Sequence, residues 1–559
     1  MPCSHREAVH ATQPNAIDLS QLEYNKSKCP IEEGICGLCR EILGVEKKIG
    51  DAVKQLEDLL SRHQQLKTEI NRTHSPIIRD LPVEVLSRIF FLCFSDRVGG
   101  KYWEPGYTDV SVQLEIGAVC RSWRQVAWSS PELWTGIVLG RRFTSSFHVC
   151  NQYGILKEWI KRSGALPLKV SISENPLDDD EDVDMDDYSV KRNEDGCDCW
   201  EMSLLLLGQS SNRWMDVSMT LSRYSFEYMA SNFKLNPPSR SLSLTSASDR
   251  GWRPPSKGHD ILKLWQESTY GPKHVTTYYL VQFRDFSINW QHVRRVYVEG
   301  WTVQDCLDLL KVAPQLESSS FNNVSEYAQE PDLIPGEPIT CHNSLRRLSF
   351  YSSDYAAKFF DHILLPSLDS LVYPVEDGLY SPIEVDDLSL MHFFIRSSFP
   401  LTELSVAAHM FTFGGMVGIL KLVPSLTCLN VYCAEKIALI DDTRMLMRFF
   451  FDKLASTVTL TTAEGSFLPR LETLELQGAW ESNFFWSSVA NIFGRPSEVG
   501  MEGRRPSKFL MLHSHTPSPV KGLSDELVAR FISLKEAGVS INYVVRPGWD
   551  DEIIPVTWE

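Results

Sequence analysis

An imperfect leucine repeat runs through the later half of this 559-residue chain and limits the folds open to it. In six segments a leading Leu is followed, three residues on, by a residue that is usually Leu, and then by a further apolar or aromatic residue. One such strand cannot bury its leucines alone, so successive copies are expected to stack over a shared core. The leading residues are Leu316, Leu345, Leu368, Leu401, Leu426 and Leu471, with looser copies at 213–221 and 292–298.

The repeat predicts an irregular leucine-rich-repeat-like α/β solenoid over residues 140–559, with helical stretches between the strands, as at 302–313 and 414–423. An ordinary α/β domain with parallel strands is the alternative. Alternation along each strand sends every second side chain inward. We expect Leu345, Leu348, Leu426, Leu429, Leu471 and Leu474 inside, and Arg346, Thr427, Asn430, Glu472 and Glu475 free on the outward face.

The segment "RDLPVEVLSRIFFLCF", residues 79–94, is apolar around most of its circumference when wound as a helix. Glu84, Ser87 and Arg88 form a narrow polar arc, and Phe91 falls inside it. A helix packed on one side of its own domain needs a single apolar stripe. We therefore expect either a partner helix over the second face, or cover from the same chain, with Tyr102, Trp103 or the preceding coil over Phe91.

Residues 31–75 carry a heptad pattern typical of a coiled coil. An amphipathic helix that lies on the rest of the protein is the alternative to intermolecular pairing. Residues 1–30 are polar and unperiodic, and we expect a disordered tail. One series of the heptad consists of Ile42, Ile49, Leu56 and Ile70, with His63 as its polar member, and the other of Val45, Ala52, Leu59 and Leu66.

The composition limits the kinds of partner and the cellular compartment that we expect for this chain. The net charge of −17 repels phosphate backbones, so no nucleic-acid partner is expected. No apolar run reaches the roughly 18 residues of a membrane span, and the N-terminus lacks the apolar core of a signal peptide, so no membrane association is expected. Cysteines scattered among apolar neighbours indicate reduced thiols and a cytoplasmic or nuclear protein.

Motifs for catalysis and metal binding are weak. There is no G-x-S-x-G, H-E-x-x-H or P-loop motif, so we expect no catalytic residue and no cofactor. Cys36 and Cys39, with Cys29, resemble half a zinc site, but cysteines three apart also simply share a helix face. The "CDCW" at 197–200 is weaker still. The acidic loop at 176–196 has neither the spaced oxygen ligands nor the glycine of a calcium site, so we expect a solvated loop and no metal.

Residues 77–138 resemble the F-box, and we set that domain at 76–139. Together with the upstream heptads and the downstream leucine repeat, the layout resembles the F-box/leucine-rich-repeat proteins of fungi. One departure is the segment at about 95–113, which is longer than the short turn of typical F-boxes. The resemblance is carried by Leu81, Pro82, Glu84, Val85, Leu86, Ile89, Phe90, Val119, Cys120, Trp123, Arg124, Pro131, Leu133 and Trp134.

The resemblance implies a three-helix unit whose fourteen motif residues bind a Skp-family adaptor and, through it, a cullin. We expect one face of the helix at 79–94 to pack on its own domain, including Val119, Trp123 and Trp134, and another face to meet a partner helix. It also implies a non-catalytic substrate receptor of a ubiquitin ligase, with an unknown protein substrate held by the solenoid. A scaffold that binds Skp without a cullin, and a hydrolase with a dispersed active site, remain alternatives. The acidic balance of the chain weakly favours a basic substrate.

Overall fold

The computed structural model describes most of the chain and leaves out several segments, among them the predicted tail, the acidic loop, and Tyr102 and Trp103. The described residues are 36–74, 81–98, 111–142, 146–175, 198–232, 239–246, 271–278, 281, 283, 286–324, 339–351, 355–373, 387–408, 411–433, 441–459, 467–478, 486–514, 524–545 and 554–555. They form two compact units, which divide between Met215 and Asp216.

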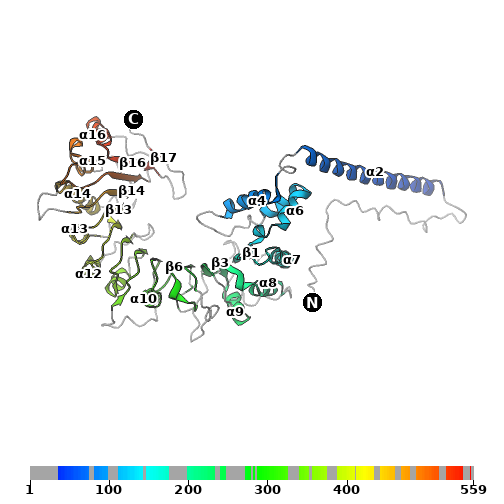
Figure 1. The fold of residues 1–559 in the computed structure, drawn as a ribbon, viewed down its shortest axis with the longest axis horizontal. Helices are drawn as coiled ribbons and strands as arrows, with labels where there is room; N and C mark the ends of the chain where they lie inside the picture. The colour runs from blue at the N-terminus through cyan, green and yellow to red at the C-terminus, as the bar shows by residue number, and fades with distance from the viewer. Residues whose placement is uncertain are drawn as a thin grey trace. The chain divides into compact units, whose positions relative to one another are not determined.

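The first unit is mainly helical and contains two parallel strands, β1 and β2 (Figure 1). Strand β1 pairs in parallel with β2, and α7 connects them. The elements are α2 (Gly37–His74), α4 (Val83–Val98), α5 (Ser111–Val119), α6 (Arg121–Ser129), η3 (Pro131–Trp134), β1 (Gly136–Arg142), α7 (Ser146–Arg162), β2 (Leu168–Asn175), α8 (Cys199–Gly208) and η6 (Ser211–Arg213).

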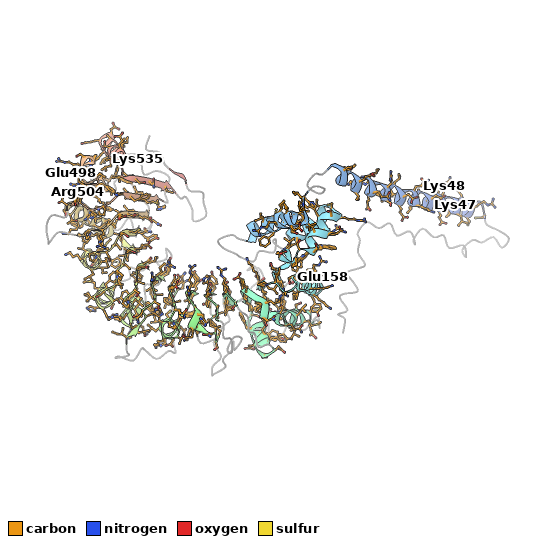
Figure 2. All side chains as sticks on the ribbon, viewed as in Figure 1. Lys47, Lys48, Glu158, Glu498, Arg504 and Lys535 are labelled. Carbon is orange, nitrogen blue, oxygen red and sulfur yellow. The ribbon has the colours of Figure 1, made fainter. Side chains whose placement is uncertain are left out.

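The predicted heptad helix is confirmed as α2, a continuous helix of 38 residues that carries Lys47 and Lys48 (Figure 2). Its heptad leucines and isoleucines are exposed, with Leu59 at 68%, except Ile49, which is half-buried. Whether this seam pairs with another helix stays a prediction. Cys36 precedes the first turn, where its sulfur accepts a hydrogen bond from the Cys39 amide at 3.4 Å.

The second unit is built on a large parallel sheet in which each strand neighbours the one before it in the chain. Only the last pair, β16 with β17, is antiparallel. Two further short strands, β8 (Thr340–Cys341) and β10 (Ile363–Leu364), pair separately. The strands run in the order β3 (Trp214–Leu221), β4 (Ser241–Ser246), β5 (His274–Tyr278), β6 (Arg295–Glu299), β7 (Ser318–Asn322), β9 (Arg347–Tyr351), β11 (Ser370–Tyr373), β12 (Glu403–Ala407), β13 (Cys428–Cys433), β14 (Thr473–Gly478), β15 (Phe509–Ser514), β16 (Ser540–Val545) and β17 (Ile554–Pro555).

Helices connect these strands and pack on one another in sequence from α10 to α16. Three of them, α10, α13 and α16, begin where polar side chains satisfy free backbone amides. Thr302 and Asp305 form a reciprocal capping box at α10, and Thr412 accepts from the Gly415 amide at α13. The helices are α9 (Arg223–Asn232), η9 (Trp290–His292), α10 (Val303–Val312), α11 (Ala356–Asp361), α12 (Asp387–Ser397), α13 (Phe413–Lys421), α14 (Asp441–Ser456), α15 (Trp486–Asn491), η11 (Pro496–Glu498) and α16 (Asp525–Glu536).

One in-register ladder of buried side chains crosses the parallel sheet from β3 to β16. Each member is 4% exposed or less. In all six aligned repeats, the residue three positions after the leading Leu lies on this ladder, and in the first repeat that residue is Ser319. The leading leucines are buried as well. The ladder is Val217, Leu242, Val275, Val296, Ser319, Leu348, Leu371, Leu404, Leu429, Leu474, Leu510 and Ile541.

The buried face of the sheet meets the helices. Phe350 of β9 stacks on Phe359 of α11 with ring centroids 4.7 Å apart, and Phe360 of α11 lies 5.0 Å from Phe393 of α12. Such aromatic pairs add about 0.5–1.5 kcal/mol beyond the burial of their area. The opposite face of the sheet carries no such helix contacts among the described residues, and we call it the open face.

One prediction about the residues of the open face is wrong. Arg346 and Glu472 are exposed as expected, and Thr427 and Glu475 are half-buried. Asn430 is wrong as a free residue, because it is only 8% exposed and its Nδ2 donates to the hydroxyl of Tyr432 at 3.1 Å. A bulky tyrosine two residues along the same strand face covers the shorter amide.

The ladder makes a prediction about stability. Replacing Leu429 by Ala should lower the free energy of unfolding by about 2–5 kcal/mol, because a cavity opens between two neighbouring strands. The matched control is Leu388→Ala on α12, where the side chain is 62% exposed and the change should stay within about 0.5 kcal/mol. Urea unfolding followed by circular dichroism measures both. Equal effects at the two positions would contradict a shared core along the ladder.

Candidate functional site: the two faces of helix α4

Helix α4 begins directly after the Leu81–Pro82 pair. The carbonyl of Pro82 accepts the first helical hydrogen bond, from the Leu86 amide at 3.0 Å. Glu84 lies in the first turn, where its carboxylate is favourable beside the free amides of the helix start. Leu81 is half-buried and Pro82 is exposed, so the pair lies at the edge of the domain.

The inner face of α4 packs on its own domain. Leu86 and Phe90 are buried, and the ring of Phe90 lies 4.9 Å from that of Trp123 on α6. The hydroxyls of Ser87 and Ser130 share a hydrogen bond of 2.6 Å. Ser87, placed by the sequence on a polar arc, is thus bonded within the domain.

The outer face of α4 is apolar and exposed. Val85, Ile89 and Leu92 follow one another at intervals of four and three residues, which places them on one side of a helix. They are 43%, 40% and 46% exposed. We call these three residues the outer stripe. An apolar stripe left in water on a helix already packed on its other side is typical of an interaction surface.

Phe91 lies between the two faces and is half-buried. The guanidinium of Arg88 lies 5.2 Å from the centre of its ring, so a cation–π contact covers part of it. The predicted cover by Tyr102 or Trp103 falls outside the described residues.

The junction of α5 and α6 holds four of the fourteen predicted residues, Val119, Cys120, Trp123 and Arg124. The Cys120 sulfur accepts from the Trp123 amide at 3.4 Å and caps α6. Arg124 Nε donates to the carbonyl of Gly117 at 2.7 Å and ties the two helices together. Val119 was expected to pack against α4, which is wrong, because it ends α5 and is 54% exposed.

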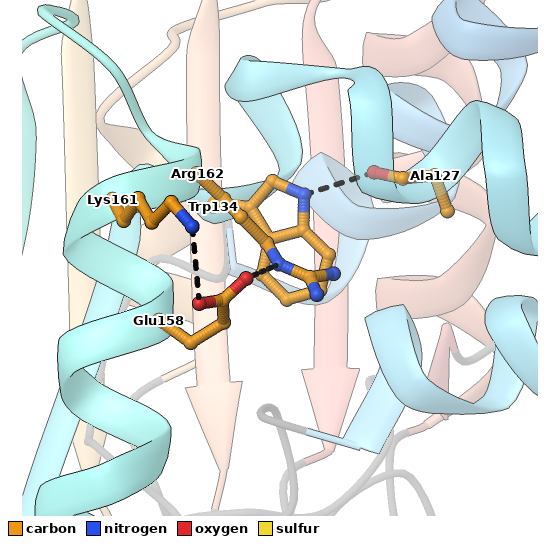
Figure 3. A network of polar contacts seen from close by, with 5 residues as sticks. All are labelled: Ala127, Trp134, Glu158, Lys161 and Arg162. Carbon is orange, nitrogen blue, oxygen red and sulfur yellow. Dashed lines mark hydrogen bonds and ion pairs between the residues drawn. The ribbon is translucent and has the colours of Figure 1, made fainter.

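The turn η3 holds the last three of the fourteen predicted residues. Pro131 opens it, and Leu133 and Trp134 are buried. The indole nitrogen of Trp134 donates to the carbonyl of Ala127 at 2.9 Å, as Figure 3 shows. The Gln113 amide donates to the carbonyl of Leu133 at 3.1 Å, so η3 is fastened to both α5 and α6.

An arginine of α7 closes over this turn. The Arg162 guanidinium lies 4.7 Å from the ring of Trp134 and 4.4 Å from that of Trp128. Glu158 accepts from Arg162 Nε at 3.0 Å and pairs with Lys161 at 4.0 Å (Figure 3). The hydrogen bond from Arg162 lowers the pKa of Glu158, so the carboxylate stays charged and orients the arginine.

The fourteen predicted residues all lie in or beside α4, α5, α6 and η3, but they do not all face outward. The fourteen predicted residues leave out four exposed apolar residues, Val83, Leu92, Leu114 and Trp128. The interval of seven from Val85 could have revealed Leu92. Pro82, Glu84, Val85, Ile89 and Val119 are exposed, Leu81, Cys120, Trp123, Arg124 and Pro131 are half-buried, and Leu86, Phe90, Leu133 and Trp134 are buried.

Residues 78–139 match the model of the F-box-like family, so the chain contains an F-box-like domain. The match covers α4, α5, α6 and η3 and reaches into β1. No curated protein matches the chain.

The described parts of the chain offer little support for a metal site, a membrane span or a disulfide. Within them, no three His, Cys, Asp or Glu side chains gather as a metal ion would require. None of the described helices is both long and apolar enough to cross a membrane. Eight cysteines of the described parts, including Cys36 and Cys39, are free thiols.

The two faces of α4 should separate by mutation. Phe90→Ala should lower the free energy of unfolding of the domain by about 3–5 kcal/mol, because it leaves a cavity beside Trp123. Ile89→Asp should change local stability by about 0.5 kcal/mol or less, because its side chain is already in water. Hydrogen exchange of the peptide spanning α4 measures both. If Ile89→Asp accelerates exchange as strongly as Phe90→Ala, the outer stripe belongs to the core.

Proposed function

We propose that this chain is the substrate-recognition subunit of a Skp–cullin–F-box type ubiquitin ligase. In this proposal the F-box-like domain binds a Skp-family adaptor and, through it, a cullin. The sheet-and-helix array of the second unit is a leucine-rich-repeat-type solenoid that holds a protein substrate. The chain itself is a non-catalytic receptor of the cytoplasm or nucleus.

The observation that carries the proposal is the outer stripe of α4, which lies within the match to the F-box-like family. Burying three half-exposed aliphatic side chains against a partner would contribute a few kcal/mol, at about 25 cal/mol per Å². The inner face is already filled by Phe90 and Trp123, so the stripe is available to a partner without unfolding the domain.

The repeat supports the second half of the proposal. A buried ladder leaves the alternate side chains of each strand on the open face, and a surface of this kind suits an extended protein ligand better than a small molecule. The exposed seam of α2 is a further interaction surface, and its self-association is part of the proposal.

The adaptor contact is tested with Leu81→Ala combined with Pro82→Ala. This variant should weaken pull-down of a Skp-family adaptor by at least about tenfold, because the start of α4 loses its fixed entry. The chain supplies a matched control in Leu166→Ala combined with Pro167→Ala, a second Leu-Pro pair with one half-buried and one exposed member.

Adaptor binding that survives at wild-type strength in the first variant, or fails equally in the control, would remove the proposed role of the F-box-like domain. Cullin in the same pull-down separates a ligase subunit from a scaffold that binds the adaptor alone.

A further inference from the structure

The open face of the second unit segregates its charge. The ladder one residue from the buried ladder runs across it in register. Its charged members change sign twice along the sheet, from Asp216 to Arg295 and Arg347 and then to Glu403. One further carboxylate of this face, Glu299 on β6, accepts a hydrogen bond from Asn323 at 3.2 Å. The ladder is Asp216, Ser241, His274, Arg295, Ser318, Arg347, Ser370, Glu403, Cys428, Thr473, Phe509 and Ser540.

Five exposed cations line this face or its edge from β4 to β9, and we call them the basic strip: Arg240, Lys273, Arg295, Arg346 and Arg347. None of the five forms an ion pair with another described residue, whereas the neighbouring Arg294 pairs with Glu317 at 3.3 Å. Their field reaches His274, whose pKa is lowered by burial and then by Arg295 and Arg240, with Asp216 opposing.

Three carboxylates occupy the same face and edge from β12 to β14, and we call Glu403, Glu472 and Glu475 the acidic strip. None pairs with a described lysine or arginine. Burial and the charge of Glu403 raise the pKa of Glu475, and burial with both glutamates raises the pKa of Cys428 to about 11. A cation placed here would relieve this repulsion.

We propose that the open face binds an extended segment of the substrate whose charges are segregated, with its acidic part on the basic strip and its basic part on the acidic strip. This proposal rests on the function proposed above and names the class of substrate. It replaces the expectation of a simply basic partner, which the basic strip would repel.

The dimensions fit such a segment. Neighbouring strands lie about 4.8 Å apart, so the eight steps from β4 to β14 span about 38 Å, or about 11–12 residues of extended chain. A nucleic acid does not fit, because the acidic strip repels phosphate along part of the same path.

The test uses the full-length protein and fluorescein-labelled peptides of about 12 residues, sized from the strand spacing. One pair of peptides joins a Glu block to a Lys block through a neutral spacer, in both chain directions. The control peptide has the same composition with Glu and Lys alternating. Fluorescence anisotropy at physiological ionic strength should show one segregated peptide binding at least about tenfold more tightly than the alternating peptide.

Variants then assign the two strips. Arg295→Glu with Arg347→Glu, and separately Glu403→Gln with Glu475→Gln, should each remove most of this preference. The matched controls carry the same changes in charge elsewhere. They are Lys421→Glu with Lys535→Glu, at exposed positions on α13 and α16 (Lys535 in Figure 2), and Glu526→Gln with Glu536→Gln on α16. Circular dichroism checks that each variant is folded.

Equal binding of the segregated and alternating peptides, or equal losses in strip and control variants, would overturn this inference. Adaptor pull-down on the same samples keeps the two proposals apart. Binding of the adaptor without peptide preference rejects the charge-segregated substrate alone, whereas peptide preference without adaptor binding rejects the ligase role and leaves the open face as assigned.

Discussion

The buried ladder of the parallel sheet is the constraint on which the second unit depends. Each strand of this sheet from β3 to β16 contributes one side chain to it, apolar in every strand except β7, which contributes Ser319, and this is too little core for a strand to be stable alone. In-register pairing places Leu404 beside Leu429 and Leu429 beside Leu474, and the helices cover them. Because the side chains of a strand alternate, the same register that builds the core also aligns the charged side chains of the open face. The buried core and the charged open face are therefore two consequences of one pairing.

A similar division into two faces occurs in α4 at a smaller scale. On its inner face, Phe90 packs on Trp123 and Ser87 shares a hydrogen bond with Ser130. The outer stripe is exposed to solvent. The contacts of Arg124, Gln113 and Arg162 hold the helices and turn behind it. A fixed helix that presents an apolar stripe loses little conformational entropy on binding, which favours association.

The sequence predicted the repeating elements well because their signal is periodic. The aligned repeats predicted six of the twelve ladder positions, from Ser319 to Leu474, and heptad spacing predicted the helix α2. Side-chain surroundings that depend on neighbours in space were harder to predict. Asn430 was taken as free because it alternates with Leu429, yet Tyr432 on the same strand covers it. Val119 has the same motif signal as buried residues but ends its helix facing outward.

The charge segregation of the open face could not be read from the sequence either. Arg295, Arg347 and Glu403 are far apart along the chain, and only the strand register places them on one ladder. Composition indicated an acidic protein and hence a basic partner. The described structure instead concentrates unpaired cations on or beside four of the five strands from β4 to β9, so the net charge of the chain is a poor guide to this surface.

The central claim is that the outer stripe of α4 is covered by the adaptor, and site-specific photocrosslinking tests it most directly. A benzoylphenylalanine at Leu92 should crosslink to a co-purified Skp-family adaptor on irradiation, whereas the same group at Lys157, exposed on α7, should not. An adaptor that still co-purifies with the Leu92 variant but crosslinks at neither position, or only at Lys157, would contradict the account.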